Sequence, residues 1–359
     1  MEHAARDVRD LCRRALAGER LEEPDIAALL AARGDAADAV FAAAREARAR
    51  RFGVAVFLYG FVYFSTYCRN ECAFCFYRVD NDESPRYRKS LDEVVAICRG
   101  LAASGVVLLD LTMGEDPVIH DDPGYAGLLE LVAAVCEGSG LPVMVSPGVV
   151  PDEVLAGLRA SGADWYALYQ ETHTPELYER LRTGQPFAAR VDARRAARRA
   201  GLLVEDGLLT GIGDTEADRA RSIAAMRAAG WEQVRVMTFV PQAGTPLADV
   251  PPAGDEAELL TIAAMRLAMP HALIPASLDV DGIRGLERRL NAGANVVTSI
   301  VPPTVGLAGV SQAELDIDEG QRTVAEVRPH LARLGLRPGT VADYRTWLAA
   351  AHRRAEVPA

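Results

Sequence analysis

No apolar run in this chain approaches the roughly 18 residues that a membrane-spanning helix needs. The stretch 1–20 is charged and helical in its periodicity, so it does not look like a secretory signal. Cysteine is scarce, with six residues in a chain of 359, which argues against a disulfide-stabilised scaffold. We therefore expect a cytoplasmic protein that has no membrane partner.

Basic residues are also in the minority. The chain has 39 Lys and Arg against 50 Asp and Glu, a formal charge of −11. A nucleic-acid-binding surface needs a basic patch, and the basic cluster at 190–199 is typical of a solvated helix face. We therefore expect no nucleic-acid partner.

Half of the residues (50%) are hydrophobic, and from residue 53 short β-rich runs alternate with helical stretches. Eight such units favour an α/β fold with a parallel sheet closed into a (βα)8 TIM barrel, with an open doubly wound sheet as the alternative. We expect three parts: an N-terminal helical extension (1–50), the barrel (51–320) and a C-terminal helical tail packed on it (321–359). The candidate strands are 54–64, 106–114, 142–148, 163–171, 202–213, 233–240, 271–280 and 294–301.

Three of the six cysteines, Cys68, Cys72 and Cys75, lie within eight residues directly after the first candidate strand. In a barrel this loop belongs to the C-terminal face, where active sites are built. Three thiolates can bind three irons of a [4Fe–4S] cluster. The fourth iron then stays open to a bidentate molecule, a role that suits the amine and carboxylate of S-adenosylmethionine (SAM). The alternatives are inert buried thiols or a zinc ion, which needs a fourth ligand that this segment does not offer.

This cysteine spacing resembles that of the radical SAM superfamily. The resemblance implies that Phe74 shields the adenine of SAM. It also implies that the turn "MGED", with Gly114 and Glu115, holds the methionyl amine, because a glycine lets the backbone approach closely.

The segment 168–201 resembles the biotin-synthase and hydrogenase-maturase branch of that superfamily. The resemblance implies that Glu171, at the end of the fourth strand, contacts SAM. It further implies that Arg190, 19 residues later, pairs with the carboxylate of SAM, a geometry that arginine provides and lysine does not. Ser146, at the end of the third strand, is an additional candidate contact.

Longer runs, such as "FLYGFVYFSTYCRNECAFCFYR" and "RLNAGANVVTSIVPP", resemble the lysine mutases of pyrrolysine biosynthesis. The resemblance implies that a 5′-deoxyadenosyl radical starts a fragmentation and recombination of L-lysine into a branched isomer. Arg235 would hold the substrate carboxylate and an aspartate its amine, although Asp110 and Arg235 could instead form a structural ion pair. The substrate-binding candidates are Asp110, Arg235, Ser277, Asp279, Thr298 and Ser299.

Two other functions stay open at this point. The chain could be a related radical SAM enzyme acting on another amino-acid-like substrate, or a metal-binding scaffold with a degenerate site. Cys12, Cys98 and Cys136 have the apolar helical spacing of core residues, which disfavours a second cluster. A radical SAM enzyme would also need an electron donor such as flavodoxin or ferredoxin.

Overall fold

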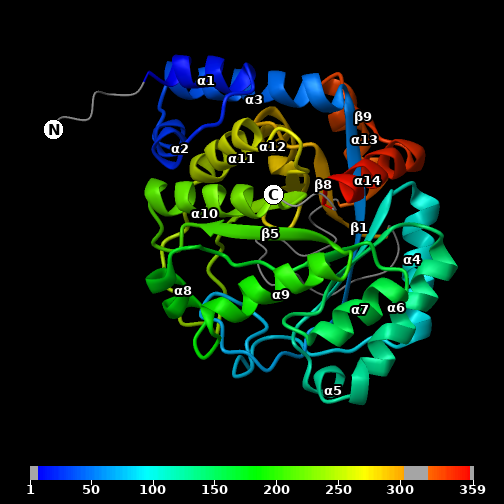
Figure 1. The fold of residues 1–359 in the computed structure, drawn as a ribbon. Helices are drawn as coiled ribbons and strands as arrows, with labels where there is room; N and C mark the ends of the chain where they lie inside the picture. The colour runs from blue at the N-terminus through cyan, green and yellow to red at the C-terminus, as the bar shows by residue number, and fades with distance from the viewer. Residues whose placement is uncertain (1–6, 303–321, 356–359) are drawn as a thin grey trace.

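A computed structural model describes residues 7–302 and 322–355. Eight parallel strands form one sheet in the order β6-β5-β4-β3-β2-β1-β8-β7, with helices around it (Figure 1). The strands are β1 (Ala55–Ser65), β2 (Leu108–Met113), β3 (Val143–Ser146), β4 (Trp165–Ala167), β5 (Leu203–Thr210), β6 (Gln233–Thr238), β7 (Pro275–Ser277) and β8 (Val296–Ile300).

The two edge strands of this sheet meet. Gln233 at the start of β6 forms a parallel bridge with Leu273, just before β7. The amide N of Val234 donates to the carbonyl of Leu273 at 3.0 Å, and the amide N of Leu273 donates to Glu232 at 2.9 Å. The predicted TIM barrel is therefore confirmed, and the open doubly wound sheet is excluded because that sheet would leave these edges apart.

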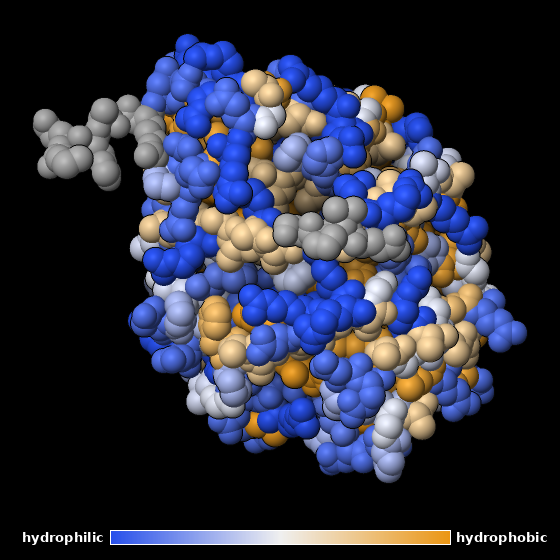
Figure 2. Space-filling view, in the orientation of Figure 1, coloured by the Kyte–Doolittle hydropathy of each residue, from blue (hydrophilic) through white to orange (hydrophobic). Residues whose placement is uncertain are grey.

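Helices cover the outside of the barrel, and their ends follow local sequence signals. α4 begins after Ser90, whose hydroxyl accepts from the amide of Glu93 while the Glu93 carboxylate accepts from the amide of Ser90. Figure 2 shows hydrophilic residues on the outer sides of the helices and apolar residues in the seams between them. The barrel helices are α4 (Leu91–Ser104), α5 (Pro117–His120), α6 (Ala126–Ser139), α7 (Asp152–Ala160), α8 (Pro175–Leu181), α9 (Phe187–Arg199), α10 (Glu216–Ala229), α11 (Glu256–Ala268) and α12 (Leu286–Asn291).

Three N-terminal helices precede the barrel: α1 (Val8–Leu16), α2 (Glu23–Leu30) and α3 (Asp35–Phe52). α2 packs against α10, and α3 packs against α11, so the N-terminal helices form an additional layer outside the barrel helices on one side (Figure 1). Cys12 is buried in this layer and Cys98 in the main core, as expected for structural cysteines. Among the described helices, none combines the length and apolarity needed to cross a membrane.

The C-terminal segment contains α13 (Val324–Arg333), β9 (Arg337–Pro338) and α14 (Val341–Ala355). β9 pairs in parallel with the start of β1, a strand that the expectation of helices alone missed, since two residues carry no periodic signal. The boundary expected at 320/321 lies outside the described residues, because 303–321 are not described.

α14 closes the end of the barrel where the strands begin. The hydroxyl of Tyr59 in β1 donates to that of Tyr344 at 3.0 Å, and it also lies 3.2 Å from Gln233 Oε1. Trp347 stacks on Trp165 at the start of β4, with ring centroids 5.8 Å apart. This end is therefore filled by side chains, which leaves the opposite end for a functional site.

Candidate active site

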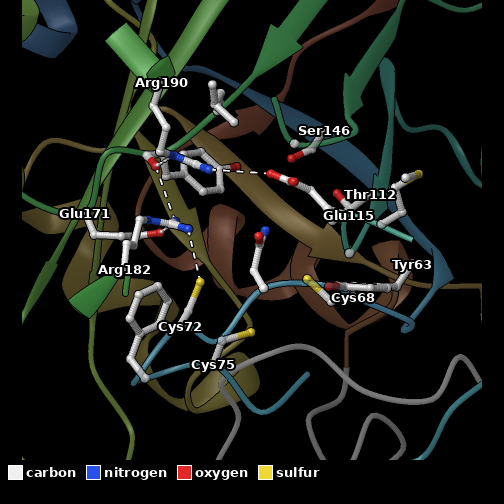
Figure 3. A pocket seen from close by; sticks show the side chains of 17 residues that line it. Tyr63, Cys68, Cys72, Cys75, Thr112, Glu115, Ser146, Glu171, Arg182 and Arg190 are labelled. Carbon is white, nitrogen blue, oxygen red and sulfur yellow. Dashed lines mark hydrogen bonds and ion pairs between the residues drawn. The ribbon is translucent and has the colours of Figure 1, made fainter. Parts of the chain in front are cut away.

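All nine residues predicted to bind the cluster or SAM line one cavity of about 150 Å³ at the C-terminal end of the strands (Figure 3). β1 supplies the cysteine loop, β2 the glycine turn, and β3 and the segment after β4 the remaining polar groups. The nine are Cys68, Cys72, Phe74, Cys75, Gly114, Glu115, Ser146, Glu171 and Arg190.

Backbone hydrogen bonds hold the cysteine loop against its neighbours. The amide of Ala73 donates to the carbonyl of Leu181 at 2.8 Å, and the amide of Arg69 donates to Glu115 at 3.0 Å. Burial, with Cys72 close by, raises the pKa of the Cys68 and Cys75 thiols. In the described part of the chain no three His, Cys, Asp or Glu side chains gather closely enough to bind one metal ion. The three cysteines instead line one cavity together.

Gly114 is required by close contact. A Cβ at this position would lie 2.3 Å from the carbonyl oxygen of Tyr67 and 2.8 Å from Cys68 Cβ. Distances below 3.0 Å are essentially never seen for real Cβ atoms. The glycine thus lets the turn after β2 lie directly against the cysteine loop.

Glu115 points into the cavity and is held by several donors. Its carboxylate accepts from the amide of Val149 at 3.1 Å and pairs with Arg69 at 3.2 Å, and Arg190 lies 3.9 Å away. Burial alone would raise the pKa of Glu115, but Arg190 and the Val149 amide outweigh it, so this pKa lies below its ordinary value.

Arg190 is buried and has little counter-charge. Its Nε donates to the carbonyl of Tyr169 at 2.9 Å, and its ion-pair partner Glu115 is 3.9 Å away. Burial and the neighbouring Arg182 lower the pKa of Arg190. A further anion in the cavity would therefore be favourable here, which fits the carboxylate of SAM.

Glu171 lies four residues beyond the end of β4, not at its end as expected. Its φ is +68°, in the left-handed region that non-glycine residues rarely adopt. Its carboxylate pairs with Arg182 at 2.5 Å, and Figure 3 shows Arg182 between Glu171 and Cys72. Arg182 was not among the predicted site residues, because it lies in the connection between two helices and has no periodic signal.

Asp206 on β5 contacts the residues on both sides of Glu171, the backbone of Gln170 and the side chain of His173. Its carboxylate accepts from the amide of Gln170 at 2.9 Å, and His173 Nε2 lies 3.2 Å from its other oxygen. Burial would raise the pKa of Asp206, but Arg194 and His173 lower it to about 2, so the carboxylate is ionised. The charged carboxylate of Asp206 therefore stabilises the strained turn at Glu171 through the Gln170 amide.

The basic cluster 190–199 is not simply a solvated face. Arg190 and Arg194 are buried, whereas Arg195 and Arg199 are exposed. Arg194 Nη1 donates to the carbonyl of Leu168 at 2.8 Å. The expectation was wrong for the inner half of this helix, because long-range partners compensate the buried charges.

A second polar group lies on the inner faces of β2, β5 and β6, next to the cavity. Arg235 donates from Nε to Glu205 at 2.9 Å, and its guanidinium lies over the Tyr169 ring, 5.3 Å from the centroid. Tyr169 itself lines the cavity and donates its hydroxyl to Glu205 at 3.1 Å. Arg235 Nη2 is buried and has no partner among the described residues. An acceptor on a bound ligand would satisfy it.

Asp110 belongs to this group but does not form the suggested ion pair. Among the described residues its hydrogen-bond donor is Thr112, at 3.1 Å, and the close partner of Arg235 is Glu205. Burial raises the pKa of Asp110 to about 7, although Arg235 opposes the shift. Within residues 7–302 and 322–355, Asp110 therefore forms no ion pair.

Ser277 and Asp279 lie together at the end of β7. The Ser277 hydroxyl donates to Asp279 at 2.9 Å, and Asp279 is 3.9 Å from Arg235. Arg322, beyond the undescribed segment, donates to Asp279 at 3.2 Å. Thr298 and Ser299 on β8 are buried, with hydroxyls that lack partners in the part of the chain described. These six substrate assignments stay predictions.

Sequence reasoning also missed Glu205 and Tyr169. Glu205 interrupts an apolar strand, and the period-two rule places it on the same face as Gly207 and Leu209, so a signal was present. Tyr169 follows a strand of only three residues, for which alternation is uninformative.

Comparisons with known proteins agree with this geometry. The model of the radical SAM superfamily matches residues 62–226, which include the cysteine loop, the glycine turn and Glu171. A TIM barrel with three cysteines at its mouth and this match together define a radical SAM protein.

Longer matches identify the branch. The 3-methylornithine synthase of Methanosarcina barkeri is 44% identical over 328 residues, covering 91% of this chain and 93% of that protein. A crystal structure of methylornithine synthase (PylB) superimposes with a TM-score of 0.89 at 43% identity, covering 94% of this chain and 99% of that one. The chain belongs to the 3-methylornithine synthase family. The hydrogenase maturase subunit HydE of Thermotoga maritima is more distant, 29% identical over 72% of this chain and 74% of its own.

Proposed function

We propose that this protein is a radical SAM isomerase that converts L-lysine to 3-methylornithine in pyrrolysine biosynthesis. The observation that carries the proposal is the polar group beside the cavity. Three carboxylates, on Asp110, Glu205 and Asp279, face the guanidinium groups of Arg235 and Arg322. With Asp110 ionised, the three carboxylates and two guanidinium groups leave the site with one net negative charge. Such a site favours a ligand with one net positive charge, and lysine, with two ammonium groups and one carboxylate, has that charge.

The cavity residues fit a [4Fe–4S] cluster and SAM. Cys68, Cys72 and Cys75 would ligate three irons, and Arg190 would pair with the SAM carboxylate. When bound, these cofactors supply a 5′-deoxyadenosyl radical that can abstract hydrogen from an unactivated carbon. The protein itself supplies position, shielding and charge.

The substrate would be held at both ends. Arg235, fixed by Glu205, would bind the carboxylate through the buried Nη2 that has no partner among the described residues. Asp110 and Asp279 would bind the ammonium groups. Transfer of a hydrogen atom from Cγ of lysine, which leaves 5′-deoxyadenosine, would let the Cα–Cβ bond break into a glycyl radical and an aminobutene. Separate anchors would keep both fragments in place until they recombine and the hydrogen atom returns. Buried walls around the site exclude water and competing hydrogen donors.

We further propose that a small electron-transfer protein of the flavodoxin or ferredoxin type reduces the cluster. The reducing cytoplasm, where thiols stay free, is the compartment in which such a site would be maintained.

An anoxic assay tests the proposal. Protein reconstituted with iron and sulfide is incubated with SAM, dithionite and isotopically labelled L-lysine, and the products are separated by chromatography with mass spectrometry. We expect labelled 3-methylornithine and lysine-dependent cofactor cleavage. Cleavage that does not depend on lysine would indicate another substrate, and an absence of cleavage would indicate a metal-binding scaffold.

Variants tie the activity to the cysteine loop. Cys72→Ala should lose the iron–sulfur absorbance and all turnover, because two thiolates would remain for the cluster. Cys136→Ala is the matched control, since Cys136 packs against the core away from the cavity and should keep both. Retained iron–sulfur absorbance in the Cys72 variant would contradict the cluster assignment.

A further inference from the structure

Cys72 differs from the two other cysteines of the loop in its hydrogen bonds. Its Sγ accepts from Arg182 Nη1 at 3.4 Å (Figure 3). It also accepts from Gln185 Nε2 at 3.1 Å. The sulfurs of Cys68 and Cys75 lie near backbone amides instead. In the described part of the chain, therefore, Cys72 is the loop cysteine whose sulfur environment depends on side-chain chemistry, including one full positive charge.

Both donors are held firmly. Arg182 is buried, and its other nitrogen donates to Glu171 at 2.5 Å and to the carbonyl of Tyr169 at 3.4 Å. Its guanidinium also lies over the Phe74 ring, 5.2 Å from the centroid. Arg182 Nη1 donates to Gln185 Oε1 at 3.4 Å, so the two donors orient each other. Such a fixed arrangement can act on a cluster without reorganising.

We propose that Arg182 and Gln185 are positioning residues that raise the reduction potential of the cluster through Cys72. The inference rests on the proposed function, because it assumes that the cysteine loop ligates a [4Fe–4S] cluster. Reduction adds one electron, [4Fe–4S]²⁺ + e⁻ → [4Fe–4S]⁺, and makes the cluster more negative. A cationic donor and an amide donor on a ligand sulfur stabilise that reduced form, as hydrogen bonds to cluster sulfurs generally do.

Arg182 has a second task that Gln185 does not share. It pairs with Glu171, the residue assigned to SAM, whereas Gln185 contacts Cys72, Arg182 and Arg190. Loss of Arg182 should therefore lower the potential and also weaken SAM binding. Loss of the Gln185 amide should lower the potential with a smaller effect on SAM, which lets the two contributions be separated.

The experiment is a redox titration of the reconstituted full-length protein, without SAM or lysine, followed by electron paramagnetic resonance of the reduced cluster. We expect the midpoint potential to shift to more negative values in Gln185→Leu and further in Arg182→Met. Arg182→Lys, which keeps the charge, should stay nearest to the wild type. Arg180→Met is the matched control, since Arg180 is on α8 but exposed, and its midpoint should not move.

Unchanged midpoints in both Arg182→Met and Gln185→Leu, at full iron and sulfide content, would overturn the inference. If Arg182→Met does not retain a cluster, Gln185→Glu decides, because a carboxylate beside Cys72 must lower the midpoint more than leucine does. A wild-type protein that assembles no [4Fe–4S] cluster would contradict the proposed function as well. A normal cluster with an insensitive midpoint would contradict only the role of Arg182 and Gln185.

Discussion

Glu205 accepts a hydrogen bond from Arg235 Nε across 2.9 Å, and both side chains are buried inside the barrel. This pair fixes the guanidinium from one side and leaves Nη2 free of partners in the described structure. The arginine is thereby oriented before any ligand arrives, which reduces the ordering cost of binding.

Glu205→Gln should weaken substrate binding while the cluster stays intact. A charge-assisted hydrogen bond contributes about 1.5–3 kcal/mol, so we expect KM for lysine to rise roughly 10- to 100-fold. Steady-state kinetics under anoxic conditions measure this, and electron paramagnetic resonance checks the cluster. Glu176→Gln on the exposed face of α8 is the control. An unchanged KM in the Glu205→Gln variant would show that Glu205 does not contribute to substrate binding.

The affinity for lysine should depend on pH through Asp110. The pKa of Asp110 is raised to about 7, so below this pH the carboxyl group is protonated and cannot pair with an ammonium group. Apparent affinity should then fall, approaching tenfold per pH unit below 7. Anoxic calorimetry between about pH 6 and about pH 8 measures it.

Asp110→Asn should bind lysine weakly across the whole range and flatten the profile. The amide has the same shape but never carries the charge. A wild-type profile as flat as that of the variant would show that Asp110 does not meet an ammonium group.

Asp206→Asn should lower both stability and SAM affinity. The pKa of Asp206 is lowered from 3.8 to about 2, so its ionised form stabilises the native state above pH 3.8, and this contribution is lost as pH falls through about 2. At neutral pH the substitution should cost about 2 kcal/mol of unfolding free energy.

The same substitution should let the turn around Glu171 relax and weaken SAM binding. Chemical denaturation and SAM titration measure the two effects, with exposed Asp192→Asn as the control. If the Asp206 variant is less stable but binds SAM with unaltered affinity, this carboxylate has no role in SAM binding.

Gly114→Ala should prevent normal assembly of the site. The added Cβ would lie 2.3 Å from the Tyr67 carbonyl oxygen, which is backbone and cannot rotate away. We expect lower iron content and loss of activity. Gly100→Ala in α4 is a matched control, since its Cβ meets nothing within 4 Å and should stabilise the helix by about 1 kcal/mol. Full iron content in the Gly114 variant would contradict the close packing.

The resemblance to the radical SAM superfamily named most of these site residues, and strand order explains why they lie together. Parallel strands end at one edge of the barrel, so residues at or just after the ends of different strands lie close together. Cys68, Gly114, Ser146 and Glu171 are such residues. The role of Arg235 also came from the resemblance, since alternation along β6 assigns a face of the strand but no substrate.

Other features have no local signal. Arg182 lies between helices, and Arg322 meets Asp279 across 43 residues of chain. The left-handed turn at Glu171 depends on Asp206, which belongs to a different strand. Such contacts arise only from tertiary structure.

The end of the barrel where the strands begin, which α14 covers, has a consequence for biosynthesis of the chain. Tyr59 in β1 forms a hydrogen bond with Tyr344 in α14, which follows it by 285 residues. Because translation runs from the N-terminus, we expect this end of the barrel, with Trp165, to stay uncovered until α14 has left the ribosome. We expect a chain that ends before α14 to leave these rings exposed, and therefore to be more prone to aggregation than the full chain.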